Sequence, residues 1–423
     1  MTDSARRSSL IAVLLGACWT LSYVDRNVLS LLVDPVKLTL ELSDTELGAI
    51  QGFAFSVFYV LAGLPLARLS DRGHRPRIMS ACIAIWCAMT MLCGLVANFW
   101  QLFAARVGVA ASEAGLPPAA LTILADVEDP KRLARTTSIF MLAPFIGGGF
   151  ALMIGGALDH LVRAWGPVSL FGSATLEPWR LVFLLVGAPG VLVAIGVLWL
   201  REPRAGRKVV APGMSFAPFF TFLRQDPKFC ALYILSMAMM AALLNANVSW
   251  MPTVLARAHR MDAHAVGMKF GPVFLAAGVI GTLAAGMVTG RSGPDVVERA
   301  FRHMRWCALI ALPAAALGPL APSLWVQLSL AAVALGCTSS LNALAPLPFL
   351  VIAPGEVRAQ AIAFLALVSA FVGTGLGPFL VGLISDHLPA VAQPLSLALA
   401  LVGGAVALAA ALMLSAVTRR VQA

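Results

Sequence analysis

The feature that most constrains this chain is a series of long apolar runs that follow one another from end to end. Each run holds roughly 18 to 28 residues, which is enough for a helix to cross a bilayer. The runs lie at about 8–32, 45–67, 77–97, 100–125, 135–158, 179–200, 229–255, 266–290, 303–320, 323–352, 358–384 and 393–416. The sequence therefore predicts an all-α membrane protein with twelve transmembrane helices.

Composition agrees with this class, because 60% of the 423 residues are hydrophobic and only 12% are charged. The net charge of +10 sits mainly in short segments between the apolar runs, which is typical of a topology signal and argues against nucleic-acid binding. The distribution of Lys and Arg places both termini in the cytoplasm, and we expect a multi-pass protein of a bacterial inner (plasma) membrane. The seven cysteines lack metal-ligand spacing, so neither a metal nor a cofactor is expected.

The longest polar interruption runs from Arg201 to Lys228 and divides the spans six and six. We expect a six-helix bundle at 1–200, a cytoplasmic linker at 201–228 and a second six-helix bundle at 229–423. An internal repeat supports this division, because Phe145-Ile-Gly-Gly-Gly149 recurs as Phe371-Val-Gly-Thr-Gly375, 226 positions later. Two pseudo-symmetric halves are typical of transporters whose substrate site lies near the midplane between them.

Four charged residues interrupt the apolar spans. Asp25 and Arg26 lie in the first span, and Arg106 and Glu113 lie in the fourth, where their seven-residue spacing puts them on one helix face. A charge at the centre of a spanning helix costs roughly 2.5–3.5 kcal/mol on insertion scales, so we expect all four to face a shared polar cavity. The two prolines that follow Glu113 predict a kink there.

The second half carries no charge at the equivalent positions, which are Asn245, Ala246, Ala332 and Ser339. Since the fold tolerates neutral residues there, we interpret the first-half charges as a proton or anion site. We hypothesise that burial favours protonated carboxyls while nearby arginines favour ionised ones, so that substrate binding to the arginines promotes proton uptake. The alternative is a buried ion network of Arg106 and Glu113 that only fixes the packing of the first bundle.

The loop between the second and third spans reads Arg68-Leu-Ser-Asp-Arg-Gly-His-Arg-Pro-Arg77. A tight glycine turn with one acid and several bases can lock helix ends in one conformation and release them in another. We therefore expect a cytoplasmic gate loop formed by Asp71, Arg72, Gly73 and Arg75. The alternative is a basic loop that acts only as a topology signal.

These motifs carry a resemblance to a known family. Asp71-Arg-Gly-His-Arg75 resembles the loop signature of the major facilitator superfamily, although this chain has Ala67 and His74 where the family has Gly and a second base. Four further segments are similar to the spinster-like branch: Tyr23-Val-Asp-Arg-Asn27, Leu42-Ser-Asp-Thr-Glu-Leu-Gly48 with Gln51-Gly-Phe53, Arg106-Val-Gly108, and Glu113-Ala114, which follows Ser112 where the family has Gly. That branch includes sphingolipid and lysophospholipid transporters.

The resemblance implies that spans one, four, seven and ten surround a central cavity. It also implies that the four intramembrane charges line that cavity and take part in proton coupling. Further cavity-lining candidates are Tyr23, Asn245, Asn247, Trp250, Ser339 and Asn342. The second-half candidates lie beside several methionines, and such a wall suits an acyl tail or a flat aromatic body, with ordinary core packing as the alternative.

We therefore expect a proton-coupled secondary active transporter of an amphipathic, lipid-like substrate of the lysophospholipid or sphingolipid type, working by alternating access. The alternative keeps the fold and the coupling but moves a small organic or aromatic acid. An enzyme is not expected, since the sequence holds no nucleophile and base arrangement, and a sensor without net flux is a further alternative. The expected partners are the substrate, protons and the lipid bilayer, without nucleic acid, and the protein is expected to be a monomer.

Overall fold

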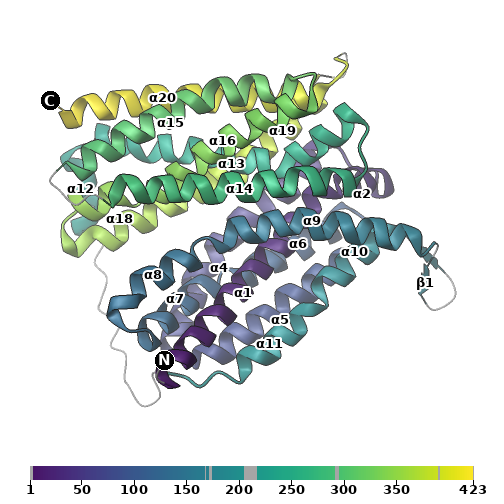
Figure 1. Cartoon of the computed structure of the whole chain (residues 1–423), viewed down its shortest axis with the longest axis horizontal. Coiled ribbons are helices and arrows are strands. Elements are labelled where there is room, and N and C mark those ends of the chain that lie inside the picture. The colour runs from purple at the N-terminus through teal and green to yellow at the C-terminus, as the bar shows by residue number, and fades with distance from the viewer. Residues whose placement is uncertain are drawn as a thin grey trace. The chain divides into compact units, whose positions relative to one another are not determined.

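The apolar runs fold as helices in the computed structural model, which describes residues 3–166, 168–170, 174–203, 217–290, 295–388 and 391–422 (Figure 1). Among these residues, eleven helical segments are long and apolar enough to cross a membrane. The run expected at 303–320 lies mainly in a further helix, α15 (Val296–Leu317), whose first half carries Glu298, Arg299, Arg302 and Arg305. These charges make α15 less apolar than the other spans.

The helices group into two compact units, which we call unit 1 and unit 2. Unit 1 comprises Met1–Leu42, Ala54–Val210 and Met261–Leu275, and unit 2 comprises Ser43–Phe53, Ala211–Arg260 and Ala276–Ala423. The expected division into bundles at 1–200 and 229–423 stays a prediction. Residues 204–216 of the expected linker lie outside the described residues.

Unit 1 contains the helices of the first six spans apart from α3, together with the start of the eighth span. Its elements are α1 (Asp3–Leu31), α2 (Val33–Leu40), α4 (Phe53–Arg72), α5 (Arg75–Cys93), α6 (Phe99–Glu113), α7 (Leu116–Val127), α8 (Pro130–Phe140), α9 (Ala143–Ala164), β1 (Val168–Leu170), β2 (Ala174–Leu176), α10 (Pro178–Gly187) and α11 (Pro189–Leu198). Helix α1 packs along α9, and α5 packs against both α6 and α11. The two strands pair antiparallel as a short hairpin between α9 and α10, which the all-α expectation did not include.

Unit 2 contains most of the second half. Its elements are α3 (Asp44–Gln51), α12 (Ala217–Gln225), α13 (Pro227–His259), the later part of α14 (Ala263–Thr289), α15, η1 (Gly318–Leu320), α16 (Leu324–Leu344), α17 (Leu347–Ile352), α18 (Gly355–Val368), the π-helical η2 (Ser369–Leu376), α19 (Gly377–Asp386) and α20 (Pro394–Gln422). Helix α20 packs along both α13 and α15, and α13 also packs against η2.

Two spans contribute to both units. The second span begins with α3, which belongs to unit 2, and continues as α4, which belongs to unit 1 apart from its first residue. The eighth span, α14, begins in unit 1, and its residues from Ala276 onward belong to unit 2. The first turns of the second span therefore belong to the unit formed mainly by the second half of the sequence. The first turns of the eighth span belong to the unit formed mainly by the first half.

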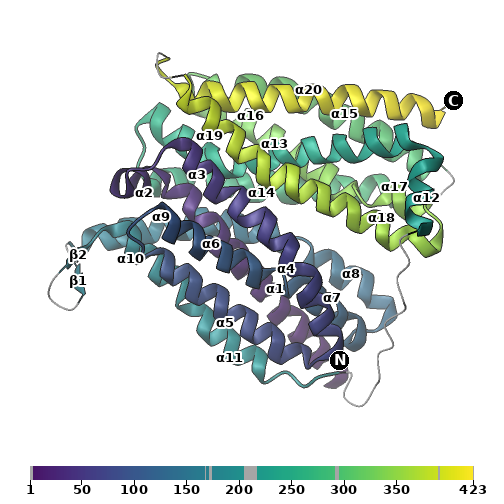
Figure 2. The ribbon, with the colours of Figure 1, turned by 180° about the vertical axis from the view of Figure 1, so that it is seen from behind.

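Helix α3 lies directly against α19 in unit 2 (Figure 2). Glycines allow this close approach, because a Cβ atom at Gly48 would lie 2.7 Å from the Pro378 carbonyl oxygen. A Cβ atom at Gly382 would likewise lie 2.2 Å from the Asp44 carbonyl oxygen. Both distances are shorter than real Cβ contacts allow, so a larger residue at either position would force the two helices apart.

The same arrangement occurs in unit 1, between α9 and the start of α14. A Cβ atom at Gly267 would lie 2.2 Å from the Leu152 carbonyl oxygen, and one at Gly156 would lie 2.7 Å from the Ala263 carbonyl oxygen. The two α9 positions precede their α19 counterparts by 226, which is the offset of the sequence repeat. The repeat thus appears in the packing as well as in the sequence.

Helix α3 begins with a capping box at Ser43. The Ser43 hydroxyl accepts a hydrogen bond from the Glu46 amide at 3.1 Å, and the Glu46 carboxylate accepts one from the Ser43 amide at 2.8 Å. The Asp386 carboxylate, at the end of α19, accepts further bonds from the amides of Asp44 and Thr45 at 3.2 and 2.7 Å. A carboxylate at a helix N-terminus is favourable, so Asp386 ties α19 to the start of α3.

The kink predicted after Glu113 is confirmed. Helix α6 ends at Glu113 and α7 begins at Leu116, with its prolines in the first turn, where a missing amide hydrogen costs nothing. Gly115 lies at this break and packs closely, because a Cβ atom there would lie 2.8 Å from the Cys82 sulfur. The break ends the fourth span's first helix at its buried carboxyl group.

Candidate functional site

The central feature of unit 1 is an ion pair between α1 and α6. Arg26 Nη2 donates to Glu113 Oε2 at 2.8 Å, and the Glu113 side chain is only 1% exposed while that of Arg26 is 19% exposed. The other Glu113 oxygen, Oε1, is buried and has no hydrogen-bond partner among the described residues. A buried carboxylate oxygen without a donor is costly unless it carries a proton. Glu113 Oε1 is therefore a candidate protonation site.

Three aromatic rings surround the Arg26 guanidinium. Its central carbon lies 3.7 Å from the Phe55 ring centroid, 4.5 Å from that of Tyr23 and 5.5 Å from that of Tyr59. The rings of Phe55 and Tyr59 stack on each other one helical turn apart on α4, with centroids separated by 5.4 Å. These rings can stabilise a cation that has few waters around it. Arg26 is thus held between one carboxylate and an aromatic wall.

Arg106 joins the cluster through the backbone of α1. Its Nη1 donates to the Asp25 carbonyl oxygen at 3.2 Å, and its Nη2 donates to the Arg26 carbonyl oxygen at 3.0 Å. The side chain is 1% exposed. A guanidinium that binds two successive carbonyls holds α6 against α1 without neutralising a carboxylate, so its positive charge acts on the whole cluster.

Asp25 points to the other side of α1, toward α5. Its side chain is fully buried, and its Oδ2 accepts a weak hydrogen bond from the Cys87 thiol at 3.7 Å. Its Oδ1 has no partner within hydrogen-bond distance among the described residues, although the buried Trp86 indole N–H, which also lacks a partner, lies near enough to interact with this carboxyl group. Asp25 forms no ion pair in the part of the chain that the structure describes. Cys87 itself is pressed against α11, because a Cβ atom at Gly190 would lie 1.9 Å from its sulfur. Asp25 Oδ1 is therefore a second candidate protonation site.

The four charges predicted from the sequence thus lie together in one cluster of unit 1. Their surroundings differ from the expected polar cavity, because Asp25, Arg106 and Glu113 are almost fully buried and only Arg26 has appreciable exposure. Removing one partner of such a buried pair costs about 3–5 kcal/mol, while the intact pair adds little net stability. A buried pair of this kind can take up a proton or exchange the carboxylate partner of Arg26 for another anion, and it can equally fix the packing of α1 against α6.

Comparison with known proteins shows the family of this chain. Residues 15–344 match the model of the Major Facilitator Superfamily. The chain belongs to the Major Facilitator Superfamily. An "MFS-type efflux pump" of Mycolicibacterium smegmatis is 32% identical over 90% of this chain and 86% of its own length. A "Probable L-galactonate transporter" of Escherichia coli is 27% identical over 68% of this chain and 63% of its own length.

A solved structure narrows the assignment within the superfamily. A bacterial homologue of the human lysosomal transporter Spinster, in an inward-facing and occupied conformation, is 27% identical to this chain. The match has a TM-score of 0.79 and covers 99% of this chain and 96% of the other. This superfamily member is therefore spinster-like, an integral multi-pass membrane transporter with an all-helical transmembrane fold of two pseudo-symmetric bundles, and its relatives give no indication of an enzyme.

The cavity-lining candidates of the second half lie in unit 2, and none of them carries a charge. Asn245 and Asn247 each donate their amide to a carbonyl one turn earlier on α13, at 2.8 and 2.9 Å. Trp250 is fully buried and donates to the Pro378 carbonyl oxygen at 2.8 Å. The Ser339 hydroxyl is buried on α16 without a hydrogen-bond partner among the described residues, while Asn342 is exposed. Whether these residues line a substrate cavity stays a prediction.

The loop that carries the superfamily signature is organised around Arg75. This side chain is 1% exposed, and its guanidinium donates to Asp126 at 2.7 Å and to Glu202 at 2.9 Å, so it ties α5 to α7 and to the segment that follows α11. Gly73 permits a tight turn, because a Cβ atom there would lie 2.6 Å from Ile78. Arg72 is exposed, and the side chain of Asp71 lies outside the described residues. The gate role of this loop stays a prediction.

Sequence reasoning missed two groups of residues. Phe55 and Tyr59 were not singled out, although their four-residue spacing on the second span was a visible signal for a shared helix face. The buried Asp44 was also missed: it accepts from Arg257 at 3.2 Å and from the Ser385 hydroxyl at 2.8 Å, and no spacing rule connects these three residues. Among the described residues, no three His, Cys, Asp or Glu side chains are grouped to hold a metal ion.

Proposed function

We propose that this protein is a proton-coupled secondary transporter of an amphipathic, lipid-like substrate of the lysophospholipid or sphingolipid type, working by alternating access. The observation that carries the proposal is the pair of orphaned carboxylate oxygens, Asp25 Oδ1 and Glu113 Oε1, beside the buried Arg106 and the partly exposed Arg26. A buried carboxyl group with one oxygen that lacks a donor is placed to hold a proton there. The spinster-like relatives and the efflux pump support a small-molecule cargo.

The coupling follows from the ion pair. When a proton binds Glu113, Arg26 loses its carboxylate partner but keeps its aromatic surroundings, and the anionic group of a substrate can take the place of the carboxylate. Conversely, an anion that binds Arg26 weakens its hold on Glu113 and favours proton uptake. The two binding events therefore promote each other, as linkage requires.

The lipid-like character of the substrate is proposed from the surroundings of Arg26. Tyr23, Phe55 and Tyr59 leave one charged group inside an otherwise aromatic wall, which suits a ligand with an anionic head and an apolar body. The resemblance to the spinster-like branch implies the same class. The direction of transport then depends on the gradient that drives it.

The test is flux in proteoliposomes under an imposed pH gradient, with labelled lysophospholipid and a labelled small organic acid compared side by side. Asp25→Asn and Glu113→Gln are expected to lose the response to the gradient. The matched control is Glu356→Gln, which neutralises an exposed carboxylate at the start of α18. An Asp25→Asn protein that responds to the gradient like the wild type would overturn the coupling proposal.

A second candidate function keeps the coupling and changes the substrate to a small organic acid. The observation that favours it is the 27% identity to the probable L-galactonate transporter, whose name gives a sugar acid as its substrate. A carboxylate could replace Glu113 at Arg26 as well as a phosphate could. Flux of the organic acid without flux of the lysolipid would establish this candidate and reject the first.

A further inference from the structure

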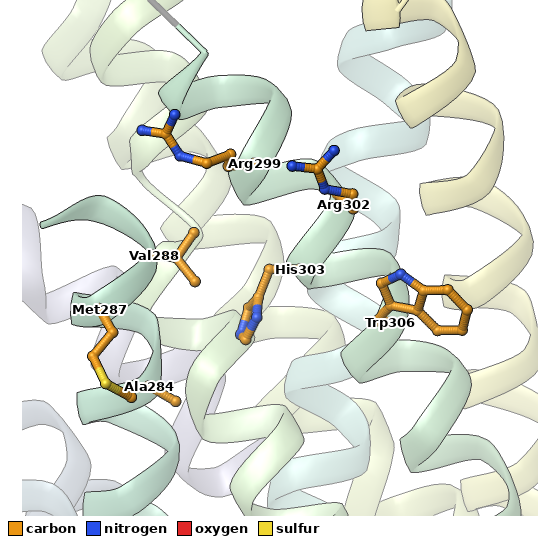
Figure 3. Close-up of a pocket in the computed structure, with 7 residues that line it drawn as sticks. All are labelled: Ala284, Met287, Val288, Arg299, Arg302, His303 and Trp306. Atoms are coloured by element: carbon orange, nitrogen blue, oxygen red, sulfur yellow. The ribbon is translucent and has the colours of Figure 1, made fainter. Parts of the chain in front are cut away.

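Unit 2 contains a cavity that the transport proposal does not use. It has a volume of about 810 Å³ and lies between the end of α14 and the first half of α15. Its lining residues are Ala284, Met287, Val288, Arg299, Arg302, His303 and Trp306 (Figure 3). All seven belong to unit 2, so the cavity is separate from the charge cluster of α1 and α6.

The cavity has a basic end and an apolar end. Arg299, Arg302, His303 and Trp306 follow a three- and four-residue spacing, which puts them on one face of α15. Figure 3 shows the two guanidinium groups at one end of the pocket, with His303 between them and the Met287 side chain. The acidic neighbour of Arg302 is Glu298, and their charged atoms lie 3.8 Å apart in an exposed pair that adds little stability. Asp295 and Glu298 bring two negative charges to the start of α15, and Arg299, Arg302 and Arg305 bring three positive ones, so this end keeps a formal net charge of +1.

The apolar end faces away from the core of unit 2. Trp306 is 53% exposed and Met287 is 73% exposed. In a helix that crosses a membrane, large exposed apolar side chains face lipid, and Trp favours the boundary between headgroups and hydrocarbon. The cavity is therefore open on the side where acyl chains lie.

The depth of the cavity matches the headgroup layer. Arg299 lies in the first turn of α15, and Trp306 lies seven residues further on, which is about 10 Å along the helix axis. The headgroup region on each side of a bilayer is several ångströms deep, so a phosphate at the arginines leaves Trp306 at the start of the hydrocarbon. A free phosphate would use only the basic end and would leave the apolar wall without a role.

We propose that this cavity binds the headgroup of an anionic phospholipid, with Arg299 and Arg302 on the phosphate and one acyl chain along Met287 and Trp306. On the expected orientation, the lipid belongs to the cytoplasmic leaflet, where basic pockets between spanning helices bind acidic headgroups. This ligand is a bound partner of the folded transporter and not its cargo.

The experiment measures lipid binding to the whole protein in detergent micelles by native mass spectrometry, with phosphatidylglycerol and phosphatidylcholine of the same acyl chains. The wild type is expected to retain phosphatidylglycerol preferentially. The double variant Arg299→Gln/Arg302→Gln is expected to bind it roughly tenfold more weakly or worse. The control Arg224→Gln/Arg419→Gln removes two exposed arginines elsewhere and is expected to bind like the wild type. Equal retention of both lipids, or equal loss in both variants, would overturn the proposal.

A second measurement needs no arginine variant and so does not depend on its folding. Phosphatidylglycerol brominated near the top of its acyl chains is expected to quench wild-type tryptophan fluorescence more than the brominated phosphatidylcholine does. The excess should disappear in Trp306→Phe, which keeps an aromatic ring at the site. Excess quenching that survives this substitution would contradict the site. Suppression of lipid binding by millimolar inorganic phosphate would show a free-phosphate site and also reject the lipid assignment.

Discussion

The two repeats of this chain share their packing but not their chemistry. Asn27 on α1 and Asn247 on α13 occupy equivalent positions, and each donates to the carbonyl one turn earlier at 2.9 Å. The close helix contacts at α9 and at α19 also correspond, at an offset of 226 positions where the two asparagines are 220 apart. The positions of the four buried charges of unit 1 correspond, however, to the uncharged Asn245, Ala246, Ala332 and Ser339. The buried charged pair of unit 2, Asp44 with Arg257, lies at a different place, beside α19. The shared packing therefore does not require charge at those four positions.

The largest expected effect comes from breaking the ion pair from one side. Arg26→Met leaves Glu113 buried without a cation, and we expect it to lower the free energy of unfolding by about 3–5 kcal/mol. Adding Glu113→Leu removes the other charge of the pair and should regain most of this stability, because no buried charge of the pair remains. Thermal unfolding in one detergent measures both variants.

Transport measurements on the same double variant test whether the ion pair has a function beyond packing. We expect pH-gradient-driven flux to stay lost although stability returns. A double variant that transports like the wild type would mean that the pair is only a packing element, and the contrast between the units would then carry no functional meaning.

The next effect concerns Asp25, whose carboxyl group has no ion pair among the described residues. We expect Asp25→Asn to unfold at the same temperature as the wild type or higher, because a neutral amide replaces a buried acid. Gradient-driven flux should fall by about 5–150-fold, the range of a typical coupling free energy. A large loss of stability together with an unchanged flux ratio between pH conditions would contradict this expectation.

A smaller effect tests whether the helix contacts are equivalent in the two units. Gly156→Ala and Gly382→Ala each place a methyl group against a backbone carbonyl, and we expect each to lower the free energy of unfolding by about 1–3 kcal/mol. Gly16→Ala and Gly286→Ala are the controls, since no atom lies within 4 Å of their added Cβ. Clearly unequal costs at Gly156 and Gly382 would break the proposed symmetry.

The smallest effect comes from adding a charge where the second repeat has none. Asn245→Asp loses the bond to the Ala241 carbonyl and sets a carboxylate near it, and we expect a loss of about 1 kcal/mol at this half-buried position. Flux should stay within twofold of the wild type, because no proton site of unit 1 is changed. The matched variant Asn247→Asp, at a buried position, should cost more stability. A gradient response altered by Asn245→Asp would show that unit 2 takes part in coupling.

Much of the fold could be predicted from the sequence, because helix length, the proline kink and the repeat are local or periodic signals. The gathering of four charges followed from the cost of exposing each to lipid. The partners of those charges could not be predicted. Arg106 binds two backbone carbonyls, and Phe55 and Tyr59 cover Arg26, which depends on how α4 and α6 rotate against α1. Periodicity shows which face is polar, but it does not show which neighbour that face meets.

The membership of α3 in unit 2 has a consequence for biosynthesis. Asp386, which caps α3, is made 342 residues after Asp44, so the ribosome must add all of the intervening spans before the two can meet. Until then the first turns of the second span lack their permanent neighbour in the membrane. A nascent chain halted before α19 would therefore leave that segment for chaperones and proteases to find.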